Sequence, residues 1–359
     1  MVFLMLETST VTEQQIRALL LDKYRLRDIT GVDILTGGRA DCYRIRTPRR
    51  DYVLKVFPPG QPITSVQDEP EVTAFLRDRG ISVARLIPTH TGEYVWQHQE
   101  RLWHLQEHID GRIFQQNTAP DWLMRDAARL LGRLHRELRD FRPLNAGFHN
   151  DWFTQWSPAR TRRQYEELIA RAEALSPGDR RERILEDLPY KIAQLYDLTP
   201  IAPDKLTRCN SHGDYHIQQM ICAPDAIRAL IDFSGAWALP VVWELIRSYN
   251  LGAPECAAGQ IDIPRLKTCI RHYLESGGEL TRYDLETMPH LYRYQLVRSK
   301  YGYQEYLSQG KQGYRPDPSQ SLENLLTFGF WRTAICRWLG KNAADLSREL
   351  VELAFHGHS

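Results

Sequence analysis

The sequence predicts an α+β protein of two unequal lobes, a small strand-rich lobe followed by a large helical one. Short apolar segments separated by glycine and proline turns occupy residues 31–108. Long helical patterns follow from residue 121 onward. The 359 residues also exceed what one hydrophobic core usually organises. We therefore expect an N-terminal lobe over residues 1–106 and a C-terminal lobe over residues 107–359.

The first lobe is expected to be a sheet accompanied by two helices. Residues 12–25 carry apolar side chains at helical spacing, with Thr12 as the N-cap. A second helix over residues 69–79 is stopped by Gly80. Five segments have strand character, at 32–38, 41–47, 51–57, 93–97 and 102–108.

The second lobe is expected to be mainly helical. Residues 121–139 place their leucines on one helical face, as expected for a helix packed on a core. Further helical patterns cover 160–175, 182–197, 262–276, 283–307 and 321–356. No internal repeat or low-complexity tail is found.

The charge and cysteine content limit the classes of function that the protein can have. Lys plus Arg number 46 and Asp plus Glu 45, a net charge of +1, so bulk attraction to nucleic acid or to an anionic membrane is not indicated. The six cysteines form no CxxC pair, which favours reduced thiols. No segment approaches the ~20 apolar residues of a membrane span, and the apolar start is too short for a signal peptide. We expect a soluble cytoplasmic protein, and the sequence is silent on its oligomeric state.

Two segments carry the most chemical information. The stretch 210–222 (NSHGDYHIQQMIC) is expected to be a loop that exposes Asp214, and 226–236 (AIRALIDFSGA) holds Asp232 in an apolar, strand-like run. An acid in such a run is costly to bury unless it is paired or ligates a metal. A hairpin would bring the two acids together, so that one serves as a base and the other as a cation ligand.

These segments resemble the aminoglycoside phosphotransferase family, which also contains choline, homoserine and methylthioribose kinases. The resemblance rests on His212–Gly213–Asp214 and on Ile231–Asp232–Phe233 and extends over about residues 31–250. It implies a bilobal protein-kinase-like fold. It also implies that Asp214 is the base for the substrate hydroxyl and that Asp232 chelates the Mg²⁺ that bridges the nucleotide phosphates.

Further parts of the chain follow the family's order. Lys55 ends a strand that resembles the one whose lysine contacts the α and β phosphates. Glu69 occupies the position of the helical glutamate that pairs with this lysine, and Glu71 is the alternative. Gly37 and Gly38 resemble the nucleotide-covering loop, although two glycines can simply make a hairpin turn.

The junction of the lobes supplies the remaining nucleotide contacts. By the resemblance, Gln106, Glu107 and His108 belong to a hinge, extending to Ile109, whose backbone pairs with the adenine. ATP is the expected nucleotide, with GTP as the alternative. His135 resembles a packed histidine of the family, with a structural role.

Two positions depart from the family pattern. Gln219 replaces the metal-binding Asn; its amide oxygen is an equally hard ligand one methylene farther out, so Mg²⁺ is still expected to bind. Glu244 stands where a structural Asp is usual. His212 is expected to support the loop from below.

The expected acceptor is a hydroxyl of a small molecule such as an aminoglycoside, an amino alcohol or a sugar. Aromatic residues of the last third could cradle a cationic amine together with Glu244, Glu305 or Asp317, although we favour a role in the core. A Ser/Thr protein kinase of the same family is one alternative. A non-catalytic pseudokinase or structural protein is the other.

Overall fold

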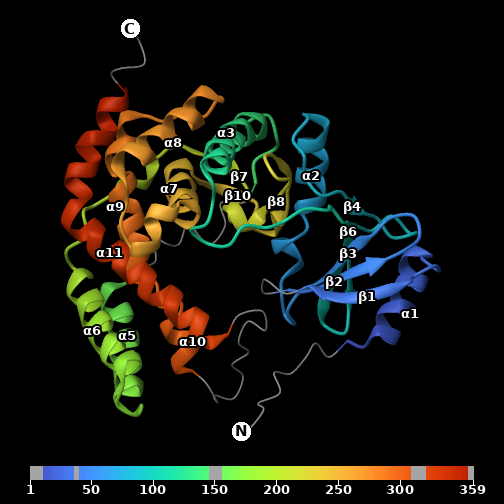
Figure 1. The fold of residues 1–359 in the computed structure, drawn as a ribbon, viewed down its shortest axis with the longest axis horizontal. Coiled ribbons are helices and arrows are strands. Elements are labelled where there is room, and N and C mark those ends of the chain that lie inside the picture. The colour runs from blue at the N-terminus through green and yellow to red at the C-terminus, as the bar shows by residue number, and fades with distance from the viewer. Residues whose placement is uncertain (1–10, 36–39, 145–155, 309–320, 355–359) are drawn as a thin grey trace.

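The computed structural model describes residues 11–35, 40–144, 156–308 and 321–354. Figure 1 shows a small lobe built around a sheet beside a larger, mostly helical lobe, so the predicted α+β bilobal fold is confirmed. The division of the chain at residues 106–107 stays a prediction. Gly37, Gly38 and Asp317 lie outside the described residues.

The N-terminal sheet has six strands among the described residues, in the antiparallel order β1-β2-β3-β6-β4 with β5 also paired to β6. The strands are β1 (Gly31–Leu35), β2 (Asp41–Arg46), β3 (Tyr52–Val56), β4 (Leu86–Ile87), β5 (Val95–His98) and β6 (Arg101–Glu107). Helix α1 (Glu13–Tyr24) covers one face of this sheet, where Ile16 and Leu20 pack on apolar strand residues. Thr12 caps α1 by accepting from the backbone N–H of Gln15, as predicted.

Helix α2 (Glu69–Asp78) lies between this sheet and the large lobe (Figure 1). Gly80 follows it with a φ of 72°, a left-handed conformation that glycine adopts without steric cost. The chain then makes a parallel bridge between Val83 and Leu230, and the N–H of Ala84 donates to the carbonyl of Leu230 at 3.3 Å. Backbone hydrogen bonds of the segment that follows α2 therefore connect the two lobes.

The large lobe consists of helices around two small antiparallel strand pairs. The strands are β7 (Arg208–Ser211) with β10 (Trp237–Pro240), and β8 (Met220–Cys222) with β9 (Ile227–Leu230). The helices are α3 (Asp121–Leu138), α5 (Pro158–Glu173), α6 (Asp179–Gln194), α7 (Val241–Gly252), α8 (Ile263–Glu275), α9 (Arg282–Arg298), α10 (Tyr303–Leu307) and α11 (Leu322–Val351). No described helix is both long and apolar enough to cross a membrane.

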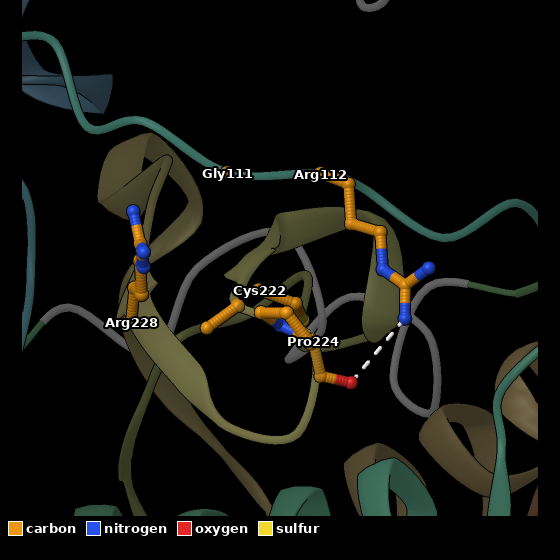
Figure 2. Close-up of a pocket in the computed structure, with 6 residues that line it drawn as sticks. Gly111, Arg112, Cys222, Pro224 and Arg228 are labelled. Carbon is orange, nitrogen blue, oxygen red and sulfur yellow. Dashed lines mark hydrogen bonds between the residues drawn. The ribbon is translucent and has the colours of Figure 1, made fainter.

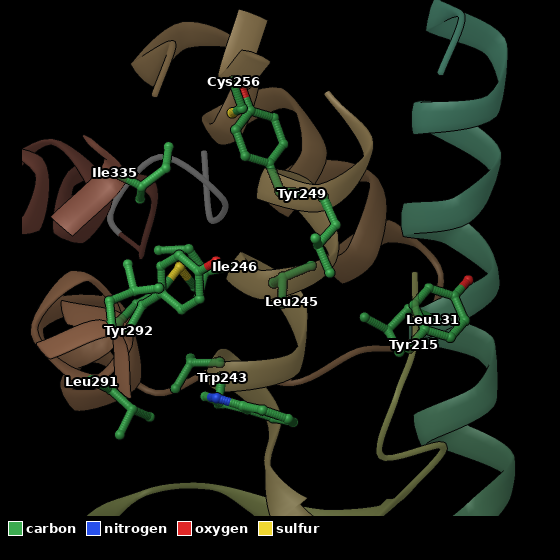
Figure 3. Close-up of a cluster of buried hydrophobic side chains, with 14 of the residues drawn as sticks. Leu131, Tyr215, Trp243, Leu245, Ile246, Tyr249, Cys256, Leu291, Tyr292 and Ile335 are labelled. Carbon is green, nitrogen blue, oxygen red and sulfur yellow. The ribbon is translucent and has the colours of Figure 1, made fainter. Parts of the chain in front are cut away.

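Helix α7 forms the centre of this lobe, and the sequence patterns did not predict it. Figure 3 shows its side chains between α3 on one side and α9 and α11 on the other. Every residue of α7 is buried except Arg247. A helix that is buried on all sides has no polar face, so the periodic pattern by which amphipathic helices are recognised is missing.

One expected helix is divided in the structure. The pattern over 283–307 is split into α9 and α10, because Ser299 ends α9 in an extended conformation with a ψ of 123°, and Gly302, with a φ of 96°, then precedes α10. Most of the described aromatic residues in the last third of the chain fill the core, including Tyr292, Tyr303 and Trp331. The expectation that they pack between long helices is therefore confirmed.

Candidate active site

Two loops emerge side by side from the small strand pairs. Asp214 follows β7, and Asp232 follows β9 with a φ of 64° and a ψ of 65°. The backbone N–H of Ile231 donates to the carbonyl of Gln219 at 2.9 Å, which fixes one loop to the other. A left-handed conformation at a non-glycine residue costs about 1 kcal/mol and is concentrated at functional sites. The hairpin expected to bring the two acids together is present.

His212 holds the two loops from beneath. It is fully buried, its Nε2 lies 2.8 Å from the carbonyl oxygen of Ile231, and its Nδ1 accepts from the N–H of Asp214 at 3.2 Å. Its ring also packs on Phe233, with 4.6 Å between ring centroids. Burial lowers the pKa of His212, so the ring is neutral and donates from Nε2. This is the supporting role that the sequence suggested.

Gly213 cannot carry a side chain. It has a φ of 81°, and a Cβ placed on it would lie 1.6 Å from the backbone oxygen of Gly235. The loop before Asp214 and the turn after Asp232 are therefore in backbone contact, which only glycine permits.

Replacing Gly213 by Ala is accordingly expected to lower the free energy of unfolding by at least about 2 kcal/mol, measured by urea unfolding. Gly80→Ala is the matched control, since Gly80 has a similar φ but nothing within 4 Å of its Cβ position. That control is expected to cost only about 1 kcal/mol. An equal loss in the two variants would refute the tight backbone contact.

Glu244 of α7 organises the Asp214 loop. Its Oε1 accepts from the N–H groups of Gly213 at 2.7 Å and Tyr215 at 3.3 Å. Its Oε2 accepts from the hydroxyl of Ser211 and lies 3.3 Å from Nε2 of His135. Burial acts to raise the pKa of this fully buried carboxyl, but His135 holds it below the ordinary value. Glu244 thus fills the structural position anticipated for an acid.

His135 of α3 completes this arrangement as a structural residue. Its Nδ1 lies 2.8 Å from the hydroxyl of Tyr273, and its Nε2 lies 2.7 Å from the hydroxyl of Ser211. Burial acts to lower the pKa of His135, but the acidic groups around it, Cys209, Tyr273 and Glu244, raise it well above the ordinary value. The histidine is therefore a cation that binds a buried anion.

Asp214 is surrounded by donors. Its Oδ1 lies 2.5 Å from Nη2 of Arg247, and its Oδ2 lies 3.0 Å from Nε2 of Gln219 and 3.4 Å from Nε2 of His216. Burial acts to raise the pKa of this carboxyl, but the charge of Arg247 holds it far below its usual range. Asp214 is therefore a carboxylate at neutral pH.

Asp232, which follows β9, pairs with Lys55 of β3. The Nζ of Lys55 donates to Oδ1 of Asp232, which also accepts from the hydroxyl of Ser234 at 2.6 Å. Burial acts to raise the pKa of Asp232, but the charge of Lys55 lowers it to about 2. Burial acts to lower the pKa of Lys55, but Asp232 and Glu69 raise it overall.

Glu69 is buried and differs from the expectation in its partner. Its Oε1 accepts from the N–H of Phe233 at 3.0 Å, and its Oε2 is buried with no hydrogen bond within the described residues. Burial raises the pKa of Glu69 to about 7 despite the nearby Lys55. The alternative residue, Glu71, faces outward and binds Arg142. In this structure the ion pair of Lys55 is thus made with Asp232 and not with Glu69, because Asp232 lies closer.

The hinge also differs in its details. The N–H groups of Glu107 and His108 donate to the carbonyls of Arg85 and Asp51, at 2.9 and 3.0 Å. Gln106 lies within β6, opposite Val53 of β3. The N–H groups of Glu107 and His108 are therefore engaged within the protein, and the contact of these residues with a nucleobase stays a prediction. Ile109, at the end of the expected hinge, has no backbone N–H hydrogen bond among the described residues.

A shallow pocket beside the β8–β9 hairpin is separate from this arrangement. Figure 2 shows the residues around it, which are Gly111, Arg112, Cys222, Ala223, Pro224 and Arg228. Arg112 donates to the carbonyl of Pro224 at 3.4 Å, and Arg228 donates to the carbonyl of Asp110 at 2.7 Å. Each guanidinium donates to one backbone carbonyl, and no carboxylate is among the described residues that line the pocket.

Arg247 is the site residue that the sequence reasoning missed. It comes three residues after Glu244 in α7, and its guanidinium reaches Asp214. The available signal was an arginine inside an otherwise apolar segment.

Comparisons with known proteins identify the family of the chain. The model of the phosphotransferase enzyme family (APH) matches residues 32–264, which is well over half of the 359 residues. The chain belongs to this family. It is a phosphotransferase that acts on hydroxyl groups of small molecules, as the sequence resemblance indicated. No curated protein sequence matches the chain.

Solved structures with the same fold cover nearly the whole chain. A spectinomycin phosphotransferase bound to ADP and spectinomycin is 16% identical, covers 97% of this chain and 99% of its own, and has a TM-score of 0.59. An amicoumacin kinase bound to AMP-PNP, Ca²⁺ and its ligand is also 16% identical (93% and 94% covered, TM-score 0.54). A microcompartment-associated aminopropanol kinase is 13% identical (93% and 99% covered, TM-score 0.58). At such identities the likeness is one of fold.

Proposed function

We propose that the chain transfers the γ-phosphate of ATP, or of GTP, to the hydroxyl of a small molecule, with Asp214 as the base. The observation that carries this proposal is the loop of Asp214, which Glu244 and His212 fix beside Asp232 and Lys55. Phosphoryl transfer needs mainly positioning and charge neutralisation, and a rigid loop between paired charges supplies both. The relatives solved with ADP and with AMP-PNP support a nucleotide donor.

In the proposed step the hydroxyl oxygen forms a bond to the γ-phosphorus. The bond from this phosphorus to the bridging oxygen breaks, and its electron pair leaves with the nucleoside diphosphate. The hydroxyl proton passes to Asp214, which is ionised at neutral pH and can accept it. Gln219 and Arg247 hold the carboxylate of Asp214 in place during this step.

The residues present fit a divalent cation. Oδ2 of Asp232 and Oε1 of Gln219 are hard oxygen atoms for which the structure describes no protein partner. Mg²⁺ is typically bound by one or two such protein groups together with phosphate oxygens and water. We propose that Asp232 and Gln219 hold Mg²⁺, which would neutralise charge on the nucleotide phosphates. The Ca²⁺ in the amicoumacin kinase complex supports a divalent metal in this fold.

Lys55 and Glu69 would act on the nucleotide side. Metal binding to Asp232 would free Lys55, which could then contact phosphate while pairing with the buried Oε2 of Glu69. We propose Ile109 as the hinge donor to the nucleobase, because its N–H makes no hydrogen bond among the described residues.

Asp232→Asn is expected to abolish the stabilisation of the protein by Mg-ATP, because the metal loses its charged ligand. Wild-type protein at a nucleotide concentration 100 times Kd should gain about 2.7 kcal/mol, seen as a higher Tm. Asp33→Asn, at an exposed ion pair with Arg46, is the control and should respond like wild type. An undiminished thermal shift in Asp232→Asn would contradict the proposed metal ligand.

A phosphate-transfer screen tests the function as a whole. ATP and GTP would each be offered with amino alcohols, sugars, aminoglycosides and a generic protein substrate, and phosphorylated products would be counted. Products from small molecules alone support the proposal, whereas phosphorylated protein alone would favour the Ser/Thr kinase alternative. We also propose a cytoplasmic location. This proposal is supported by the six cysteines, which are all free thiols.

A further inference from the structure

Arg247 places a positive charge directly at the proposed base. Its Nη2 lies 2.5 Å from Oδ1 of Asp214, while its Nη1 is buried with no hydrogen-bond partner within the described residues. The guanidinium also lies over the ring of Trp243, 5.5 Å from the centroid. A buried donor without a partner is costly, so this nitrogen is suited to bind a group from outside the chain.

A second arginine, Arg332, belongs to α11. Arg332 lies 5.6 Å from the ring of Phe328, and the structure records no hydrogen bond or ion pair for its guanidinium in the described ranges. Burial lowers the pKa of Arg332, Tyr292 acts to raise it and the charge of Arg247 acts to lower it, so the two guanidinium groups influence each other electrostatically. Both guanidinium charges also act on Tyr292 of α9, whose pKa burial raises to about 12.

Two of the three acids that were expected to hold a cation, Glu244 and Glu305, are engaged elsewhere, and Asp317 lies outside the described residues. Glu244 is fully buried and binds the Asp214 loop. Glu305 accepts from the N–H of Gly302 at 2.6 Å, where it caps α10. Neither of these two acids forms an ion pair with Arg247 or Arg332 among the described residues.

Building on the proposed function, we propose that the acceptor carries an oxyanion, a carboxylate or a phosphate, close to the hydroxyl that is phosphorylated. Arg247 and Arg332 bind this oxyanion from helices α7 and α11. Arginine suits both oxyanions because its planar guanidinium donates two parallel hydrogen bonds.

Four compounds with one carbon skeleton test the charge preference. Purified full-length chain with Mg-ATP would be assayed with D-glycerate, glycerol 3-phosphate, glycerol and 3-amino-1,2-propanediol. We expect kcat/KM at least tenfold higher for one or both anionic compounds than for glycerol, and the better of the two identifies the oxyanion. A preference for the amine, or equal rates, would overturn the inference while leaving phosphate transfer itself intact.

Variants of Arg332 test the binding group. Arg332→Gln is expected to lower kcat/KM for the anionic compound about 10- to 100-fold through KM, and Arg332→Lys to restore part of it. Arg183→Gln is the control, because Arg183 is an exposed arginine that lies over the ring of Phe330 at 4.3 Å. An unchanged KM in Arg332→Gln would contradict the role of this residue.

A binding arm separates this inference from the proposed function. The thermal shift of the chain by each compound would be measured with Mg-AMP-PNP present. If no compound is phosphorylated, the proposed function fails for this series. Stabilisation by the anions that disappears in Arg332→Gln would then still support the oxyanion site, and its absence would overturn it.

Discussion

Asp214→Asn is expected to slow phosphate transfer about 10²- to 10⁴-fold while Mg-nucleotide binding persists. Asparagine keeps the shape of the side chain and can still accept from Arg247, but it cannot take the hydroxyl proton. The rate would be followed by coupled detection of nucleoside diphosphate, and binding by thermal shift. Because the pKa of Asp214 lies far below its usual range, its protonation should not limit the rate near neutral pH.

The control for this variant is Asp225→Asn, an exposed acid in the turn between β8 and β9. It is expected to retain wild-type rates. Full activity of Asp214→Asn would remove the proposed base from the account, and loss of nucleotide binding would show that the loop itself had been disturbed.

Glu244→Gln is expected to have the largest effect on stability, a loss of about 3 kcal/mol in the free energy of unfolding. The amide would still accept from Gly213, but it would place an N–H₂ group against Ser211 and the cationic His135. Urea unfolding measures the loss. Glu186→Gln is the control, because Glu186 is an exposed partner of Arg337 and should cost little.

The pH dependence of the free energy of unfolding provides a second test of the role of Glu244. Its pKa in the folded protein is lowered, so the stability it contributes is present above the pKa of an unfolded carboxyl. This contribution is lost as the pH falls through the folded pKa. Glu244→Gln should therefore flatten the acid side of the stability curve, and an unchanged acid limb would contradict the buried charge pair.

The parts that the sequence could predict are those with local signals. The strand and turn patterns predicted the N-terminal sheet, and the run His212–Asp214 with Asp232 predicted two loops that meet in a hairpin. These features depend on short sequence motifs. Gly213 belongs to such a motif, and its conformation and its contact with Gly235 require glycine.

The rest depended on tertiary contacts that no local pattern encodes. Arg247 reaches Asp214 only because α7 is buried at the centre of the lobe, where a helix has no amphipathic signature. The pairing of Lys55 with Asp232 instead of Glu69 is decided by distances between side chains that are far apart in the sequence. The occupied N–H groups of Glu107 and His108 likewise follow from strand pairing within the sheet.

A crystal structure with Mn²⁺ and AMP-PNP would test the central claim most directly, because the anomalous signal of Mn²⁺ locates the cation. The account predicts one cation bound by oxygen atoms of Asp232 and Gln219 and by the nucleotide phosphates, with Lys55 released from Asp232 to contact phosphate. A cation or a nucleotide bound away from Asp232, with the pair between Lys55 and Asp232 intact, would contradict it.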